Sequence, residues 1–412
     1  MVAIKELVAV AKAAALEAAD HQELFAAEDT EARKIVDTME RFLRIKSRVV
    51  YGGAAINAHL PSDKKFYDPS LYLPDYDFLT PDPLQDCADL IVAFQNEGFT
   101  ELEAKFGMHE GTYKVFVNFR PAADITYMPL EIYERIMKDS TSIEGIQYAS
   151  VNYLRMNMYL ELSRPAGMVS RWEKVYERLL LLNETFPIRP GKCGKTTLEP
   201  NDLTDPILKI GIEAGAVFIS GTGALHGSDV QSGVVLMISD NTDKLVHELQ
   251  SLHLRATHHE ALGEILPARI ELFKDSTLVA VVFETVACHN YTTLRSPKNY
   301  RIGSIDLLIQ MYYAMYYANL QHYVSARVLC IIQELIDLEM TRRTAAAKGK
   351  IPPHDVFPLD CIGHQPTIPE LKKAHRTRVA EKRKNLSKAL KFQDSFRVSR
   401  RKHRVSKFMK DN

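Results

Sequence analysis

The sequence contains no apolar run long enough to cross a membrane. Stretches such as residues 277–283 fall well short of the ~18 residues that a transmembrane helix needs. The N-terminus also lacks the pattern of a secretory signal, because Lys5, Lys12 and Glu17 interrupt its Ala- and Val-rich run. We therefore expect neither a membrane protein nor a secreted one.

Cysteine is scarce. The chain has five cysteines, at positions 87, 193, 288, 330 and 361. Their wide spacing fits neither a zinc-ligand pattern nor a disulfide framework. The expectation is an intracellular, reducing compartment and no zinc finger.

The chain has no net charge as a whole, but its charges are distributed unevenly along the sequence. Residues 371–412 hold 16 Lys and Arg against 3 Asp and Glu, whereas the other 370 residues hold 36 against 49. A basic segment of this kind predicts a polyanionic partner.

What is present is the composition of a globular protein of more than one domain. Of its residues, 46% are hydrophobic and 25% are charged. Its length of 412 residues exceeds the usual ~150 residues of a single domain. Periodicity predicts a helical segment over 3–45, then an α/β layer of strands and helices up to Tyr127. Long helical runs follow at 151–162 and 171–182, and a Pro- and Gly-rich patch at 186–206.

A fainter copy of the α/β layer follows this patch. Residues 217–221 are similar to 49–53, and 300–307 are similar to 147–154, at offsets of about 154 to 168 residues. The order of similar segments predicts a tandem duplication. The second copy lacks acidic residues where the first has them, so we expect it to be a scaffold without an active site.

The strongest candidate site combines three aspartates. Asp75 and Asp77 lie two apart in a strand pattern and so share one face, about 7 Å apart along the strand. Asp124 lies in a separate apolar strand. If the two strands are neighbours, the three carboxylates converge, and Mg²⁺ or Mn²⁺ would relieve their repulsion with oxygen ligands. A pair of such ions could serve nucleotidyl transfer.

Gly52 and Gly53 stand where a strand turns into a helix. Free backbone N–H groups at a helix N-terminus attract phosphate, and glycine lets the phosphate approach closely. Separately, a glycine pair can be a simple turn and an Asp-x-Asp a solvated loop. Their order along the chain favours a triphosphate site beside a metal site.

This order of motifs resembles the nucleotidyltransferase superfamily of DNA polymerase β type. Residues 51–57 (YGGAAIN), 74–78 (PDYDF), 159–165 (YLELSRP) and 170–176 (SRWEKVY) resemble, more closely, the poly(A) polymerase catalytic subunit of large DNA viruses, the poxviral and giant-virus group. The resemblance implies an α+β fold: a nucleotidyltransferase-type mixed sheet with helices, followed by a second, degenerate nucleotidyltransferase-like α/β unit. It also implies Asp75, Asp77 and Asp124 as catalytic metal ligands and Gly52 and Gly53 at the triphosphate.

Five segments follow from the resemblance and the patterning together: a helical N-terminal segment (1–45), the catalytic core (46–140), a helical region and linker (141–200), the degenerate domain (201–340) and a basic tail (341–412). The resemblance to giant-virus members further implies a homodimer, found in the virion and the host cytoplasm. The partners expected are ATP and an RNA 3′ end.

Further nucleotide contacts are predicted on the helices after the core, at Asn152, Arg155, Arg171 and Lys174. Arg171 and Lys174 share a helix face and could hold phosphates. The alternative is a solvated charged face.

The basic tail is the candidate for RNA binding, since basic segments bind phosphate backbones without sequence preference. Its candidate residues are Arg383, Lys384, Arg400, Arg401 and Lys402. A nuclear-localisation-like patch and a solvated helix are the alternatives.

These observations predict a template-independent polynucleotide adenylyltransferase that adds AMP from ATP to RNA 3′ ends. A nucleotidyltransferase with another acceptor (a tRNA end, a protein or a small molecule) and a non-catalytic RNA-binding scaffold remain as alternatives.

Overall fold

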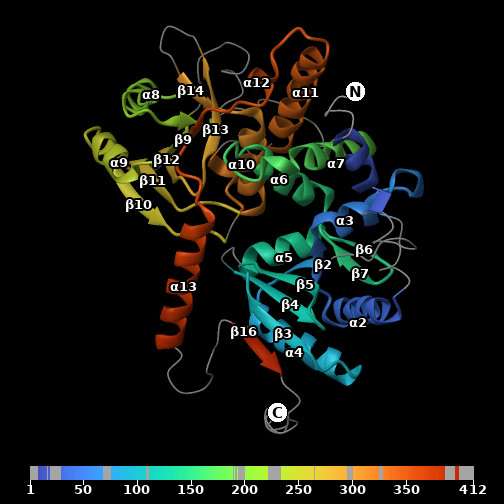
Figure 1. Ribbon diagram of the computed structural model, residues 1–412. Coiled ribbons are helices and arrows are strands. Elements are labelled where there is room, and N and C mark those ends of the chain that lie inside the picture. Colours follow the sequence, from blue (N-terminus) through green and yellow to red (C-terminus); the bar gives the residue numbers. More distant parts are fainter. Residues whose placement is uncertain are drawn as a thin grey trace. The chain divides into compact units, whose positions relative to one another are not determined.

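The chain forms two compact units, each built on a mixed β-sheet. A computed structural model describes residues 8–15, 17–18, 29–67, 76–107, 111–188, 190, 193, 200–220, 233–263, 265–294, 300–323, 328–385 and 395–398 (Figure 1). Unit 1 comprises 1–150 with 371–412, and unit 2 comprises 151–370. Among the helices so described, none is both long and apolar enough to span a bilayer.

The sheet of unit 1, sheet 1, has the strand order β16-β3-β4-β5-β2-β1-β7-β6. Its strands are β1 (Val49–Tyr51), β2 (Tyr76–Thr80), β3 (Leu102–Phe106), β4 (Thr112–Val117), β5 (Arg120–Tyr127), β6 (Thr141–Ile143), β7 (Ile146–Tyr148) and β16 (Ser395–Val398). The pairs β2–β5 and β1–β7 are parallel, and the other neighbours are antiparallel.

One face of sheet 1 is covered by helices. The helices of unit 1 are α2 (Thr30–Lys46), α3 (Gly52–His59), α4 (Pro83–Asn96), α5 (Leu130–Asp139) and, from Leu371 on, α13 (Ile368–Asn385). Asp29 caps α2 by accepting from the N–H groups of Glu31 and Ala32. The apolar stripe of α2 reaches the sheet at Phe42, whose ring centroid lies 6.0 Å from that of Phe78. Helix α4 packs beside it against β3, β4 and β5.

Unit 2 repeats this architecture. Its strands are β8 (Val217–Phe218), β9 (Val235–Ser239), β10 (Arg255–His259), β11 (Arg269–Lys274), β12 (Thr277–Glu284), β13 (His289–Leu294), β14 (Tyr300–Gly303) and β15 (Cys361–Ile362). Its helices are α6 (Val151–Leu162), α7 (Trp172–Thr185), α8 (Thr204–Glu213), α9 (Thr242–Gln250), α10 (Ile305–Tyr317), α11 (Val328–Ala347) and α12 (Pro353–Val356). Sheet 2 has the order β10-β11-β12-β9-β8-β14-β13-β15.

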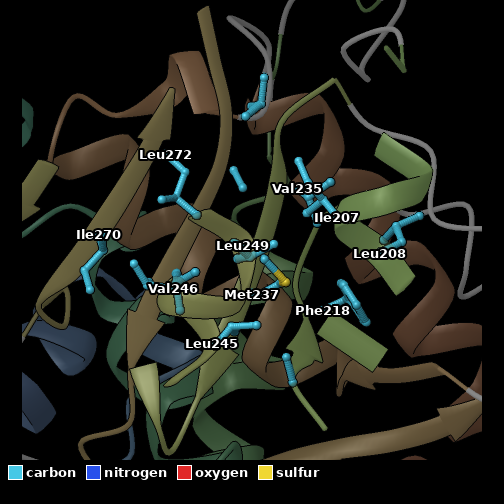
Figure 2. Close-up of a cluster of buried hydrophobic side chains, with 14 of the residues drawn as sticks. Ile207, Leu208, Phe218, Val235, Met237, Leu245, Val246, Leu249, Ile270 and Leu272 are labelled. Carbon is cyan, nitrogen blue, oxygen red and sulfur yellow. The ribbon is translucent and has the colours of Figure 1, made fainter. Parts of the chain in front are cut away.

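The core of unit 2 lies between sheet 2 and the helices α8 and α9. Figure 2 shows Phe218 and Met237 of the sheet among side chains from both helices, including Leu208 and Leu249. All four are at most 2% exposed. The central strands β9 and β12 are buried along all or most of their length, which agrees with their continuous apolar sequences.

The predicted duplication is confirmed by the topology. The order β3-β4-β5-β2-β1-β7-β6 of sheet 1 recurs as β10-β11-β12-β9-β8-β14-β13 in sheet 2, with the same parallel and antiparallel pairs. Even the turn after the second strand repeats, because Thr80 accepts from the N–H of Asp82 and Ser239 accepts from that of Asn241. The predicted fold class, with two mixed sheets in tandem, is therefore confirmed.

A buried ionic cluster joins three helices of unit 2. The guanidinium of Arg343 (α11) donates to both carboxylate oxygens of Asp306 (α10) at 2.7 Å and to Glu339 one turn away. Tyr159 (α6) donates to Glu339 at 2.6 Å. All four are at most 7% exposed. Burial raises the pKa of Glu339 to about 7, although Arg343 opposes this shift.

The structure corrects the interpretation of the cysteines. Cys193 pairs with Cys330 and Cys288 with Cys361, both as disulfides, and Cys87 is a buried free thiol. The expectation that the cysteines form no disulfides is wrong, and with it the argument for a reducing compartment. The partners are 137 and 73 residues apart in the chain, so spacing alone could not pair them.

Two local features of sheet 1 concern β4 and β3. Strand β4 ends at Val117, because Asn118 and Phe119 adopt positive φ and Phe119 is 72% exposed. Strand β3 has the sequence LEAKF, which contains no β-branched residue and so has a weak strand signal of its own.

Candidate active site

Two of the predicted carboxylates meet at the centre of sheet 1. Asp77 on β2 lies directly opposite Asp124 on the parallel neighbour β5. Their neighbours in sequence, Phe78 and Ile125, pair one position on and are fully buried under the helices. Because side chains alternate along a strand, both carboxylates lie on the other face of the sheet. There they are half-buried, and Asp124 is 22% exposed.

The third carboxylate, Asp75, lies outside the described residues, as β2 begins at Tyr76. Within the described parts of the chain, no group of three His, Cys, Asp or Glu side chains could hold a metal ion. The predicted trio therefore stays a prediction. The oxygen donors of Asp77 and Asp124 suit Mg²⁺ or Mn²⁺.

Gly52 allows α3 to begin beside Asp77. Its φ is +73°, a conformation that favours glycine, and a Cβ there would lie 2.4 Å from Oδ2 of Asp77. The preceding Tyr51, opposite Asp77 on β1, makes no side-chain cap to α3. Gly52 and Gly53 are the first two residues of α3, so their backbone N–H groups lie at the positive end of the helix dipole. This arrangement can bind a phosphate next to the carboxylates.

Helix α3 is held at its other end by His59. One ring nitrogen of His59 lies 2.8 Å from the carbonyl oxygen of Ala149, which follows β7. Burial lowers the pKa of His59, and the bond to Ala149 only partly opposes this. A neutral ring that donates to the carbonyl follows at neutral pH. At the first turn, the hydroxyl of Tyr51 lies 3.0 Å from that of Thr126 on β5, which fixes the residue before Gly52.

Lys114 is a site residue that the sequence interpretation missed. It lies on β4 directly opposite Asp124, and its ammonium donates to Oδ2 of that carboxylate. Lys114 is 39% exposed. The alternation that buries Tyr113 and Val115 was the available signal, because it places Lys114 on the other face of the sheet, beside Asp124.

Arg155, predicted to contact the nucleotide, is buried among residues of unit 2. Arg155 is 2% exposed. Its guanidinium donates to the side-chain oxygens of Asn183 and Asn152, at 2.7 and 2.9 Å, and to the carbonyls of Leu182 and Phe186. Such contacts join α6 to the end of α7, and a role of Arg155 toward a nucleotide stays a prediction.

The other predicted nucleotide residues also belong to unit 2. The side-chain oxygen of Asn152 also accepts from Tyr313, at 3.2 Å. Arg171 pairs with Glu161 at 3.0 Å, and Lys174 is exposed on α7. Their role toward a nucleotide stays a prediction.

The tail contributes to the sheet as well as carrying charge. Arg383 and Lys384 belong to the last turn of α13, whereas Arg400, Arg401 and Lys402 lie outside the described residues. Between them, β16 pairs antiparallel with the edge strand β3. The sequence interpretation considered RNA binding, a nuclear-localisation-like patch and a solvated helix for this segment, and missed the strand.

Unit 2 lacks the chemistry at the equivalent positions. In the matching register, Leu236 and Val281 lie opposite each other where sheet 1 has Asp77 and Asp124. Both are fully buried. Ile219 is the counterpart of Tyr51, and its carbonyl accepts a hydrogen bond from the hydroxyl of Tyr312 on α10 at 2.9 Å. An apolar pair under a helix cannot hold a cation, as expected for a degenerate copy.

The same segment that carries these residues matches a known family. Residues 37–168 match the family model of the poly(A) polymerase catalytic subunit. This confirms the resemblance seen in the motifs. Gly52, Gly53, Asp77 and Asp124 all lie within the matched segment.

Individual relatives agree. A putative poly(A) polymerase catalytic subunit of Acanthamoeba polyphaga mimivirus is 34% identical over 163 residues, which are 38% of this chain and 27% of that protein. Another, from African swine fever virus (isolate Tick/Malawi/Lil 20-1/1983), is 25% identical over 194 residues, 46% of this chain and 40% of that protein. The matches thus span well under half the length of these relatives.

The fold extends the similarity over both units. A crystal structure of the Megavirus polyadenylate synthase superposes with a TM-score of 0.77, at 20% identity, and the match covers 97% of this chain and 86% of that one. The two-sheet architecture is therefore shared with that enzyme.

Proposed function

We propose that this protein is a template-independent poly(A) polymerase that transfers AMP from ATP to the 3′ end of RNA. The observation that carries the proposal is the pairing of Asp77 with Asp124 beside the start of α3 at Gly52. The family match over this segment and the names of the relatives support the choice of reaction.

In the proposed reaction, the terminal 3′-oxygen of RNA attacks the α-phosphorus of ATP. A new P–O bond forms, the bond to the β-phosphate oxygen breaks, and pyrophosphate leaves. The hydroxyl proton passes to Asp124 or to water. The N–H groups at the start of α3 hold the triphosphate, and Asp77 and Asp124 fix the position of the reacting atoms.

Asp75, Asp77 and Asp124 would hold Mg²⁺ or Mn²⁺ in this site. When bound, the cation favours ionisation of the attacking hydroxyl and neutralises charge on the leaving pyrophosphate. Asp77 and Asp124 provide carboxylate oxygens on neighbouring strands for this purpose.

The test compares matched Asp-to-Asn variants. Purified protein is incubated with labelled ATP, an oligoribonucleotide and Mg²⁺ or Mn²⁺. We expect a ladder of products, reduced more than ~100-fold in Asp77→Asn and in Asp124→Asn. Asp37→Asn is the control, because Asp37 is exposed on α2 at the other face of the sheet.

Other outcomes would contradict the proposal. A ladder of equal strength from all three variants would remove the carboxylates from the chemistry. No product from the wild type on any RNA would favour a non-catalytic RNA-binding scaffold. Product only with a non-RNA acceptor would point to a different nucleotidyltransferase.

The resemblance to giant-virus members also supports a homodimer, located in the virion and the host cytoplasm, as part of this proposal. Light scattering on the purified protein tests the dimer directly. A monomer at micromolar concentration would contradict it.

A further inference from the structure

A row of side chains continues from the carboxylates toward the edge of sheet 1. Asp77, Asp124, Lys114 and Lys105 lie opposite one another on the neighbouring strands β2, β5, β4 and β3. Adjacent strands are ~4.8 Å apart, so the row passes directly from the acidic residues to two lysines. Both lysines are 39% exposed.

An aromatic ring lies beside the lysines on the same face. Phe116 is two residues after Lys114 on β4 and is half-exposed, while Val115 and Val117 on either side are fully buried. The ammonium of Lys105 lies 4.0 Å from the centroid of this ring. We name Lys105, Lys114 and Phe116 the basic strip.

Positive charge beside a partly exposed ring is the composition of a surface for single-stranded nucleic acid. Lysines contact the phosphates, and the ring stacks on a base of any kind. The ion pairs that the lysines make here, with Glu103 at 3.5 Å and with Asp124, are partly exposed and therefore weak. An ammonium has three donors, so Lys114 can bind Asp124 and a phosphate together.

The order of the strands separates this strip from the triphosphate. The start of α3 at Gly52 follows β1, on one side of the carboxylate pair, and the strip lies on β4 and β3, on the other side. In an in-line displacement, the attacking and the leaving oxygen occupy opposite sides of the phosphorus. With pyrophosphate leaving toward α3, the attacking nucleotide enters from the side of β4.

We propose that the basic strip binds the 3′-terminal nucleotides of the acceptor RNA, with Lys114 and Lys105 at the phosphates and Phe116 stacked on a base. This inference rests on the proposed polymerase function and adds the path of the acceptor to it.

The test measures RNA binding without catalysis. A fluorescein-labelled oligo(A) decamer is titrated with protein in EDTA, without ATP, and its anisotropy gives Kd at several salt concentrations. In Lys105→Ala/Lys114→Ala the slope of log Kd against log salt should fall by ~1.4, since each lost contact to a single strand removes ~0.7. Phe116→Ala should raise Kd ~5-fold or more through lost stacking.

The control is Lys34→Ala. Lys34 lies on α2, at the opposite face of the same sheet, and is 49% exposed. It removes one charge from the same unit and should leave both Kd and slope unchanged. Thermal melts of all variants establish that they fold. The single variant Lys105→Ala is included because it keeps the ion pair between Lys114 and Asp124.

Two results would overturn the inference. In the first, the folded double variant binds RNA as tightly, and with the same salt dependence, as Lys34→Ala, which would show that the basic strip does not bind RNA. If the double variant is unfolded, the same comparison is made with Lys105→Ala. Weakened binding of ATP with unchanged binding of RNA would assign the lysines to the nucleotide. Failure of the proposed function is a separate outcome, seen as absence of RNA elongation by the wild-type protein.

Discussion

Replacing Gly52 by alanine tests the geometry of the site with a single methyl group. The new Cβ would lie 2.4 Å from Oδ2 of Asp77, whereas an ordinary contact begins at 3.4 Å. The Asp77 carboxylate must therefore shift by about 1 Å, which costs little energy because the short side chain can rotate. A misplacement of ~1 Å in a catalytic group can reduce the rate ~10²-fold.

The same substitution also strains the backbone, because φ at Gly52 is +73°. A residue with a Cβ in this conformation costs ~1–2 kcal/mol. Gly98→Ala separates the two effects, since Gly98 has φ +89° in the same unit but nothing within 4 Å of the added Cβ. Both variants should lose similar stability in urea denaturation.

Only Gly52→Ala should lose activity. The assay is the initial rate of AMP addition at saturating ATP, measured well below the melting temperature of both variants. If Gly52→Ala elongates RNA as fast as Gly98→Ala, the close approach of Gly52 to Asp77 has no part in the reaction. If both lose activity equally, the loss comes from stability and the reasoning fails as well.

Two predictions concern buried charge in unit 2. Arg343→Met leaves Asp306 and Glu339 without their cation and should cost ~3–5 kcal/mol of unfolding free energy near pH 8. The cost should be smaller at pH 5, because burial raises the pKa of both carboxyls, that of Glu339 to about 7, and Glu339 takes up a proton there; an equal cost at both pH values would contradict this. His289 is 2% exposed, its ring nitrogens have no hydrogen-bond partner among the described residues, and burial, with Arg164 nearby, lowers its pKa to about 3. In the unfolded chain, the His289 ring binds a proton below pH ~6.5, whereas the folded chain keeps it neutral. The free energy of unfolding of the wild type should therefore fall by up to ~1.4 kcal/mol per pH unit as the pH falls from ~6.5 toward 3. His289→Leu should remove that slope in urea titrations at pH 7 and 5, and an unchanged slope would show that His289 does not titrate as described.

Patterning in the sequence was sufficient for the framework of the site. Strand alternation and the glycine pair located β1, α3, β2 and β5, because these elements have a strict period and clear ends. The opposition of Asp77 and Asp124 followed once the two strands were taken as neighbours. The duplication was visible because apolar strands and their turns kept their order in both copies.

What escaped prediction depends on how separate segments of the chain pair with one another. Alternation on β4 gives the face on which Lys114 lies, but its place opposite Asp124 depends on the register between β4 and β5. The strand β16 exists because it pairs with β3, almost 300 residues earlier. The disulfides likewise join cysteines that only the tertiary fold brings together. The contact of Arg155 with the carbonyl of Leu182 at the end of α7 likewise appears only in the tertiary fold.

The repeat of one topology in two sheets gives Asp77 and Asp124 inert counterparts, Leu236 and Val281, within the same molecule. Leu236 and Val281 gain the free energy of full burial, roughly 1.5–3 kcal/mol each. The carboxylates Asp77 and Asp124 do not gain this free energy, and they repel each other because they lie on adjacent strands. Lys114 offsets part of this repulsion. The two copies thus differ in function at matching positions: the carboxylates lie in the first sheet, and the second sheet has buried apolar side chains that stabilise the fold.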